Sequence, residues 1–267
     1  SGDVLDSQLN SQIYMLNLGY SNTSFSFFLA GINRIKNNNW RNLYQDSQQE
    51  ISMKNSLVID PEHALNIYIT STMEYYGWTS YPWEKQIYPL RQGVVIRTGC
   101  LPGGDILDNN LGKVVVHEVG HFLGLFHTFD EFLKCQDADQ VNDTPIHLEN
   151  TGCPPDDADT CTGQPGFDPI YNYMNYTNDP CRNQFTYGQS ERMDQIVQEF
   201  IPNIGGSIIN IINYITINSG NSLQLLGNIT AIFSSGKRII VNGSFTSNNV
   251  IFTSNSTWGG IQFNSGS

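Results

Sequence analysis

Basic residues are scarce in this chain of 267 residues, where 13 Lys and Arg stand against 25 Asp and Glu and the formal net charge is −12. Because phosphate binding needs a basic surface, this balance disfavours a nucleic-acid partner. Long apolar runs are also missing: none approaches the roughly 18 residues of a membrane span, so we expect a soluble protein. The first residues lack an initiator methionine, a basic segment and an apolar core, and therefore do not form a signal peptide. We favour a fragment of a longer protein over a processed form.

Closely spaced cysteine pairs are absent as well. Without a CxxC pair a structural zinc knuckle is not expected, and disulfide bonds formed in an oxidising compartment explain the cysteines better. We therefore predict a secreted or extracellular protein. The five cysteines are Cys100, Cys135, Cys153, Cys161 and Cys181.

Residues 1–203 mix strand and helix patterns and predict a domain of the α/β (α+β) class. Between residues 127 and 185 the chain is rich in Asp, Pro, Gly and Cys, and a loop of that length is expected only if it is functional or cross-linked. The predicted strands are 12–21, 23–32, 64–70 and 93–99. The predicted helices are 46–57, 109–124 and 188–201, the last with Ser190 as its N-cap.

Residues 204–267 have a different composition, with almost no acid or cysteine and short Ile-, Val- and Phe-rich segments separated by Asn, Ser and Gly. This spacing predicts a small all-β repeat segment, the first rungs of a parallel β-helix or of another β-solenoid. IIVNGSF at 239–245 and WGGIQF at 258–263 are typical of such rungs. A small β-sandwich is the alternative.

The string HEVGHFLGLFH, which begins at His117, carries the clearest chemistry. On a helix, His117 and His121 lie one turn apart on the same face, where both imidazoles can bind one metal ion. His127 would miss that ion on a continuous helix, but Gly124 can adopt positive φ and turn the chain. Three nitrogen ligands leave a fourth position for water, as in catalytic zinc sites. Glu118 can then take a proton from this water.

The spacing HExxHxxGxxH is the signature of metzincin peptidases. Metzincins also have a methionine turn below the metal, for which Met174 is the candidate, as an apolar base that does not bind the ion. Tyr176 follows two residues later, where its phenol could hydrogen-bond an oxyanion. His63 and His147 have no such company and are expected to be ordinary surface or core residues.

Together with this signature, DQVNDTP at 139–145, NYMNYTND at 172–179 and the cysteine pattern resemble the pappalysin family of metzincins. The resemblance covers about residues 10–201. It implies a metzincin-like catalytic domain with a twisted sheet, an active-site helix and a Met-turn subdomain. It also implies a set of roles: His117, His121 and His127 as zinc ligands, Glu118 as general base and Tyr176 as transition-state stabiliser.

The resemblance further implies the disulfides Cys135–Cys161 and Cys153–Cys181, which would contribute about 3 kcal/mol each in the chain-entropy model. It also implies a calcium loop, since oxygen donors on an acidic segment suit Ca²⁺. From charge alone, a solvated acidic surface is an equal alternative for this segment. The implied ligands are Asp139, Asn142 (through its carbonyl) and Thr144, with Glu131 as a further ligand in question.

Asp179 stands where the family has an acid at the base of the S1′ pocket. This implies a preference for Arg or Lys directly after the scissile bond, because a buried carboxylate pairs with a cation. The alternative is that Asp179 only caps the turn before Pro180.

We therefore predict a secreted, calcium-stabilised zinc endopeptidase that acts on protein or peptide substrates. The strand at 93–97 is expected at the edge of the cleft, where it would pair with extended substrate. One alternative is an inactive peptidase-like scaffold that serves adhesion through the β-rich tail, with a carbohydrate or a surface as partner. Another is a zinc hydrolase acting on something other than peptides. Cys100 is left over and is expected to be buried or paired outside the chain.

Overall fold

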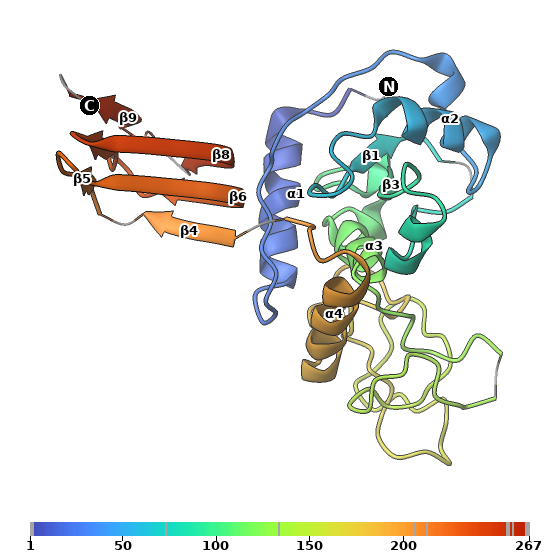
Figure 1. Cartoon of the computed structure of the whole chain (residues 1–267). Coiled ribbons are helices and arrows are strands. Elements are labelled where there is room, and N and C mark those ends of the chain that lie inside the picture. The colour runs from blue at the N-terminus through green and yellow to red at the C-terminus, as the bar shows by residue number, and fades with distance from the viewer. Residues whose placement is uncertain are drawn as a thin grey trace. The chain divides into compact units, whose positions relative to one another are not determined.

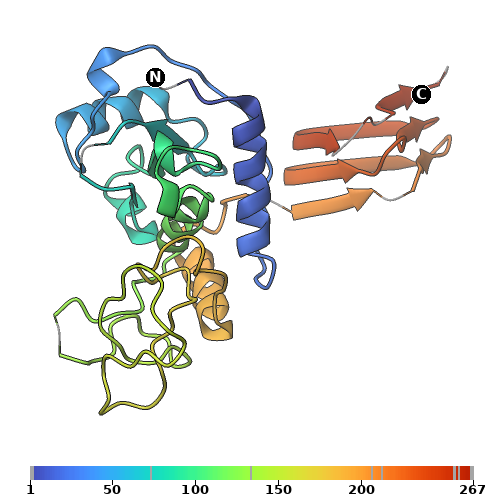
Figure 2. The same cartoon turned by 180° about the vertical axis from the view of Figure 1, so that it is seen from behind.

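The computed structural model describes residues 3–72, 74–132, 134–205, 207–211, 213–254, 257 and 259–264. The chain divides into two compact units, the first from residues 1–61 and 65–202 and the second from 62–64 and 203–267. Figure 1 and Figure 2 show the helices of the first unit and the strands of the second from opposite sides. None of the helices in the described residues has the length and apolar character that crossing a membrane requires.

The centre of the first unit is a three-stranded sheet in the order β1-β3-β2. Strand β3 (Val94–Arg97) pairs in parallel with β1 (Ile67–Thr70) and antiparallel with β2 (Gly77–Thr79). The expectation that the 93–97 strand forms the edge of the cleft is therefore wrong. Its run of buried Val and Ile is typical of a strand covered on both sides, and among the described strands the free edge on that side belongs to β2.

Helix α3 (Lys113–Phe122) packs against β2 and β3, and all its residues from Val114 onward are buried. Helix α4 (Tyr187–Phe200) begins after Thr186, whose side chain accepts a hydrogen bond from Gln189 N. The Gln189 side chain in turn accepts a hydrogen bond from Thr186 N at 2.9 Å, which completes a capping box. The predicted cap Ser190 is therefore wrong by four residues.

Residues 12–19 of the predicted strand 12–21 belong to helix α1 (Asp6–Gly19), and Tyr20 is its C-cap. Its buried positions Gln12, Leu16 and Gly19 follow the helical period and face α3. The Gln12 amide donates to Gly112 O at 2.9 Å. A short run of apolar residues does not distinguish the two periods, and the fit against α3 decides for the helix.

The segment 23–32 was also predicted as a strand, but it pairs with no strand among the described residues. The side-chain amide of Asn17 in α1 forms the hydrogen bonds that a neighbouring strand would form at Phe27. It accepts from Phe27 N and donates to Phe27 O, both at 2.8 Å. The ring of Phe27 packs edge-on against Tyr20, with centroids 5.1 Å apart. A side chain of α1 thus satisfies both backbone groups of Phe27, where a neighbouring strand would otherwise do so.

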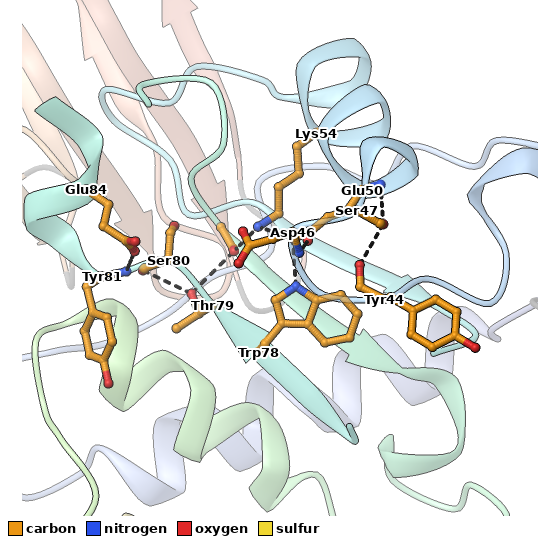
Figure 3. A network of polar contacts seen from close by, with 11 residues as sticks. Tyr44, Asp46, Ser47, Glu50, Lys54, Trp78, Thr79, Ser80, Tyr81 and Glu84 are labelled. Carbon is orange, nitrogen blue, oxygen red and sulfur yellow. Dashed lines mark hydrogen bonds and ion pairs between the residues drawn. The ribbon is translucent and has the colours of Figure 1, made fainter. Parts of the chain in front are cut away.

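Helix α2 (Gln48–Leu57), capped by Ser47, carries a buried ion pair, and a hydrogen bond from Trp78 of β2 reaches this pair. Glu50 and Lys54 lie 2.9 Å apart, and the indole of Trp78 donates to the same Glu50 oxygen at 2.7 Å (Figure 3). Lys54 also donates to Gly93 O at 3.1 Å. Because both charges are buried and hydrogen-bonded, they fix α2 and β2 to each other. The short 3₁₀ helices of this unit are Asn38–Trp40, Pro82–Gln86, Thr98–Cys100 and Leu107–Asn109.

The long segment between α3 and α4 has no regular helix or strand among its described residues. Two disulfides cross-link it, Cys135–Cys161 and Cys153–Cys181, and these are the pairs that the family resemblance implies. Cys100 lies buried in the 3₁₀ helix before α3 and is in neither disulfide. Cross-links of this kind explain how so long a segment stays ordered without secondary structure.

The second unit has two parallel sheets in the orders β4-β6-β8 and β5-β7-β9. In both sheets the pairing steps along the chain by 21 to 24 residues. Ser222 pairs with Ser244 and Ile229 with Val250 in the first sheet, and Ile215 pairs with Ile239 in the second. A buried cluster that includes Phe233 forms its core. The strands are Ser207–Ile211, Ile215–Ile217, Ser222–Phe233, Ile239–Val241, Ser244–Ser254 and Ile261–Phe263.

Candidate metal centre

Three histidines meet at the end of helix α3. His117 and His121 lie on one face of the helix, which ends at Phe122. Gly124 then adopts φ +99°, and the reversed chain brings His127 back to the other two. Within the part of the chain that the structure describes, these three form the one cluster of metal-binding side chains, with ligand atoms within 4.8 Å of one another.

The hydrogen bonds of the rings define which nitrogen atoms face the centre. Each Nδ1 lies 2.7 Å from an oxygen that can only accept: Tyr173 O for His117, Leu125 O for His121 and a Glu131 carboxylate oxygen for His127. In a neutral imidazole the single proton is therefore on Nδ1, and Nε2 carries a lone pair.

These lone pairs point at one another. Nε2 of His121 lies 3.1 Å from Nε2 of His117 and 3.1 Å from Nε2 of His127. Three converging lone pairs repel one another, and a cation between them turns the repulsion into attraction. Burial holds the pKa of His117 well below its usual value, and it lowers that of His121 from 6.5 to about 3. The rings of His117 and His121 are thus neutral at pH 7, as a zinc ligand must be.

Glu118 lies beside this cluster and is 7% exposed. Burial raises the pKa of its carboxyl to about 8, against a lowering effect of the Arg182 charge. The carboxylate has room because Gly77 of β2 has no side chain: a Cβ there would lie 2.9 Å from Glu118 Cγ. Neither Gly77 nor Arg182 belongs to a motif, so neither was predicted from the sequence.

Met174 lies under the helix and is fully buried. A Cβ on Gly120 would lie only 2.5 Å from its sulfur, so Gly120 allows the thioether to reach the helix between the two histidines. The turn itself is fixed by the side chain of Asn172. Its Oδ1 accepts a hydrogen bond from Met174 N at 2.9 Å, and its amide group forms two reciprocal hydrogen bonds with the side-chain amide of Gln189 in α4. The sequence predicted the methionine but not the amide pair that holds it.

Two phenols border the histidines. Tyr176 is 44% exposed, and the centroid of its ring lies 4.6 Å from that of His127. Partial burial raises the pKa of its phenol, and the charge of Glu118 raises it further. Tyr81 was not predicted from the sequence. Its hydroxyl lies 3.4 Å from His121 Nδ1, and burial raises its pKa to about 12. Both groups are therefore protonated at neutral pH and can donate a hydrogen bond.

Asp179 is fully buried, and both of its carboxylate oxygens bond to groups of this chain. One carboxylate oxygen forms an ion pair with Arg182 at 2.5 Å. The other accepts from Leu111 N at 2.8 Å and Lys113 N at 3.3 Å, at the start of α3. This arrangement gives Asp179 a structural role at the start of α3, which is a different role from the cap of the turn before Pro180 that the sequence suggested as the alternative.

The residues of the expected calcium loop satisfy one another. Asp139 is buried, and its two oxygens accept from Val141 N at 3.0 Å and from the Thr144 hydroxyl at 2.8 Å. Burial raises the pKa of Asp139 to about 6. Asn142 is exposed between them. His147 is a core residue with Nε2 2.9 Å from the Thr128 hydroxyl, and it lies outside the histidine cluster, as does His63.

Fold and site together define a metzincin-type metallopeptidase. Residues 52–198 match the family described as pregnancy-associated plasma protein-A, and the chain belongs to this family of pappalysin-type metalloendopeptidases.

Similar proteins include two fungal relatives named extracellular metalloprotease. That of Arthroderma benhamiae is 39% identical over 204 residues, which is 75% of this chain and 73% of the relative. That of Pyricularia oryzae is 38% identical over 204 residues, 75% and 70% of the two chains.

Among solved structures, mirolysin in complex with compound 9 superposes with a TM-score of 0.64 at 28% identity, over 74% of this chain and 89% of that chain. Mature mirolysin of Tannerella forsythia in complex with a cleaved peptide gives a TM-score of 0.62 at 25% identity, with the same coverage. The first unit therefore has a mixed α/β, metzincin-like fold. A metzincin-type metalloprotease implies zinc, and the histidine cluster fits this ion.

Proposed function

We propose that this chain is a secreted zinc endopeptidase whose zinc is held by His117, His121 and His127. The observation that carries this proposal is the convergence of three Nε2 lone pairs, each fixed by an acceptor at Nδ1. Secretion is supported by relatives named extracellular metalloproteases and by the two disulfides. The peptidase domain would comprise residues 1–203.

Zinc held by the three histidines would supply a Lewis acid for the substrate carbonyl and would make the attacking water more acidic. The positive charge of bound zinc would lower the pKa of Glu118 from its metal-free value of about 8. The ionised carboxylate would then accept the proton of the attacking water and pass it to the leaving amine. Tyr176, protonated at neutral pH, donates a hydrogen bond to the developing oxyanion. The free edge of β2 would pair with extended substrate, since β3 lies inside the sheet.

The test is cleavage of a mixed peptide library followed by mass spectrometry, with zinc content measured on the same samples. We expect internal cleavage that phenanthroline blocks and that Glu118→Ala abolishes while zinc stays bound. An inactive scaffold is not favoured by the comparisons. It would become the better interpretation if zinc-loaded protein cleaved nothing.

Preference for Arg or Lys directly after the cut rests on the family resemblance at Asp179. Because Asp179 also pairs with Arg182, its replacement separates a role in specificity from a role in stability. If Asp179 sets specificity, Asp179→Asn loses the basic preference and keeps its zinc. If it only holds the start of α3, the variant loses stability and its preference is unchanged.

Calcium binding at Asp139, Asn142 and Thr144 is proposed from the resemblance alone. A rise in the melting temperature with Ca²⁺ that Asp139→Ala removes would support it. For residues 204–267 we propose β-solenoid rungs, supported by parallel pairing at a step of 21 to 24 residues. A carbohydrate or surface partner of this part is a proposal without structural support.

A further inference from the structure

The three histidines differ in what orients them. His117 and His121 each bond a backbone carbonyl at Nδ1, so the chain fold itself sets the direction of these rings. His127 bonds a side chain instead, Glu131 Oε1 at 2.7 Å. Because His127 lies beyond the turn at Gly124 and off the helix, no turn of α3 fixes its ring.

The position of Glu131 is set by the turn around it. The neighbouring Asp130 is buried and accepts three backbone N–H groups, from Phe132 at 2.8 Å, Lys134 at 2.9 Å and Gln136 at 3.1 Å. The Asp130 backbone N–H in turn donates to His147 O at 2.9 Å. The disulfide Cys135–Cys161 attaches the end of this turn to the later part of the segment. Glu131 is therefore presented from a preorganised turn, although its side chain is 60% exposed.

One face of the His127 ring is restrained by Phe129. The two rings are stacked, with centroids 4.8 Å apart and planes inclined by 9°. Stacking restrains the plane of the imidazole but allows a 180° flip about χ2, and the bond at Nδ1 selects one of the two orientations. The carboxylate thus decides whether Nε2 points to the centre.

We propose that Glu131 is a positioning residue for His127, which it orients and makes a stronger metal ligand through a carboxylate–histidine–metal chain. This proposal rests on the proposed zinc site. It assigns to Glu131 a role different from the calcium ligand considered from the sequence. It also makes the third ligand depend on a side chain that solvent can reach.

The experiment measures the zinc dissociation constant of the full chain by competition with a chromogenic chelator. We expect Glu131→Ala to weaken zinc binding about 10-fold, at the low end of the range for such partners because the carboxylate is partly exposed. Glu131→Gln, which keeps an acceptor but not the charge, should fall between Glu131→Ala and the unmodified chain. The visible spectrum of the cobalt-loaded protein should change in the same order.

Glu149→Ala is the matched control, since Glu149 is an exposed acid whose charge acts on the neighbouring Tyr176 and raises its pKa. It should bind zinc like the unmodified chain. Equal losses in the Glu131 and Glu149 variants, or unchanged affinity in both Glu131 variants, overturn the proposal and leave the zinc site standing. A chain that binds no zinc at all overturns the proposed function instead. Circular dichroism of the metal-free variants separates loss of folding from loss of the ligand.

Discussion

At the scale of single residues, the space beside Glu118 depends on an absent side chain. Gly77 faces Glu118 from β2, and an added Cβ would lie 2.9 Å from Glu118 Cγ and 3.0 Å from Val95 O. The backbone atom cannot move, so the carboxylate must.

We expect Gly77→Ala to lower kcat about 10-fold or more, because the displaced carboxylate no longer meets the attacking water, while zinc content stays the same. Steady-state kinetics and metal analysis check this. Gly31→Ala is the control, since nothing lies within 4 Å of a Cβ there. Unchanged kcat in Gly77→Ala would mean that the carboxylate has freedom to adjust.

The buried histidines give the metal-free protein an acid sensitivity. The pKa of His121 is about 3 in the folded chain and 6.5 when exposed. Below pH 6.5 the unfolded chain takes up a proton that the folded site refuses, so the free energy of unfolding falls as the pH drops toward 3. The slope is at most about 1.4 kcal/mol per pH unit for this group. Urea unfolding of the chelator-treated protein measures it. His121→Asn should flatten the slope, and an equal slope in both proteins contradicts the assignment.

At the scale of elements, the turn after α3 decides whether the third histidine reaches the others. Gly124 has φ +99°, and a Cβ there would lie 2.4 Å from Ile196 of α4. Backbone strain and a steric clash therefore act together.

Gly124→Ala should destabilise the protein by about 3 kcal/mol or more and weaken zinc binding. Gly152→Ala is a matched comparison, because Gly152 also has positive φ but has open space around it. It should lose only about 1 kcal/mol, from strain alone. Chemical unfolding of both variants separates the two terms, and similar losses would mean that α4 yields to the added methyl group.

The contact between α2 and β2 depends on a charge pair. Lys54→Met leaves the Glu50 carboxylate buried without its cation and should cost about 3 kcal/mol in unfolding free energy. The double variant Glu50→Gln with Lys54→Met removes both charges and should be more stable than the single variant. Urea titration of all three proteins decides this. A double variant as unstable as the single one would show that packing, not charge, holds α2.

At the scale of the whole molecule, all the residues of the metal centre lie in the first unit. We expect a chain ending at Pro202 to keep its zinc affinity and its kcat/KM within about a factor of two, as for a domain with its own core. It gives up the bond from Gly205 N to His63 O. Metal analysis and peptide cleavage test this. An insoluble or inactive product would show that the peptidase needs residues 203–267.

The sequence alone determined the family, the metallopeptidase activity and the helix that carries HEVGH, because fixed spacings on a helix translate directly into shared faces. It also predicted α2, β1 and β3, whose periodic patterns are local. It misassigned 12–21 and 23–32, where a short apolar run fits a strand and a helix equally well.

Only the tertiary structure decided which strand is the edge, what faces Glu118 and what orients each histidine. Gly77, Asn172 and Arg182 meet their partners through pairings that are distant along the chain. No local pattern records such contacts, because they arise when separate elements pack together.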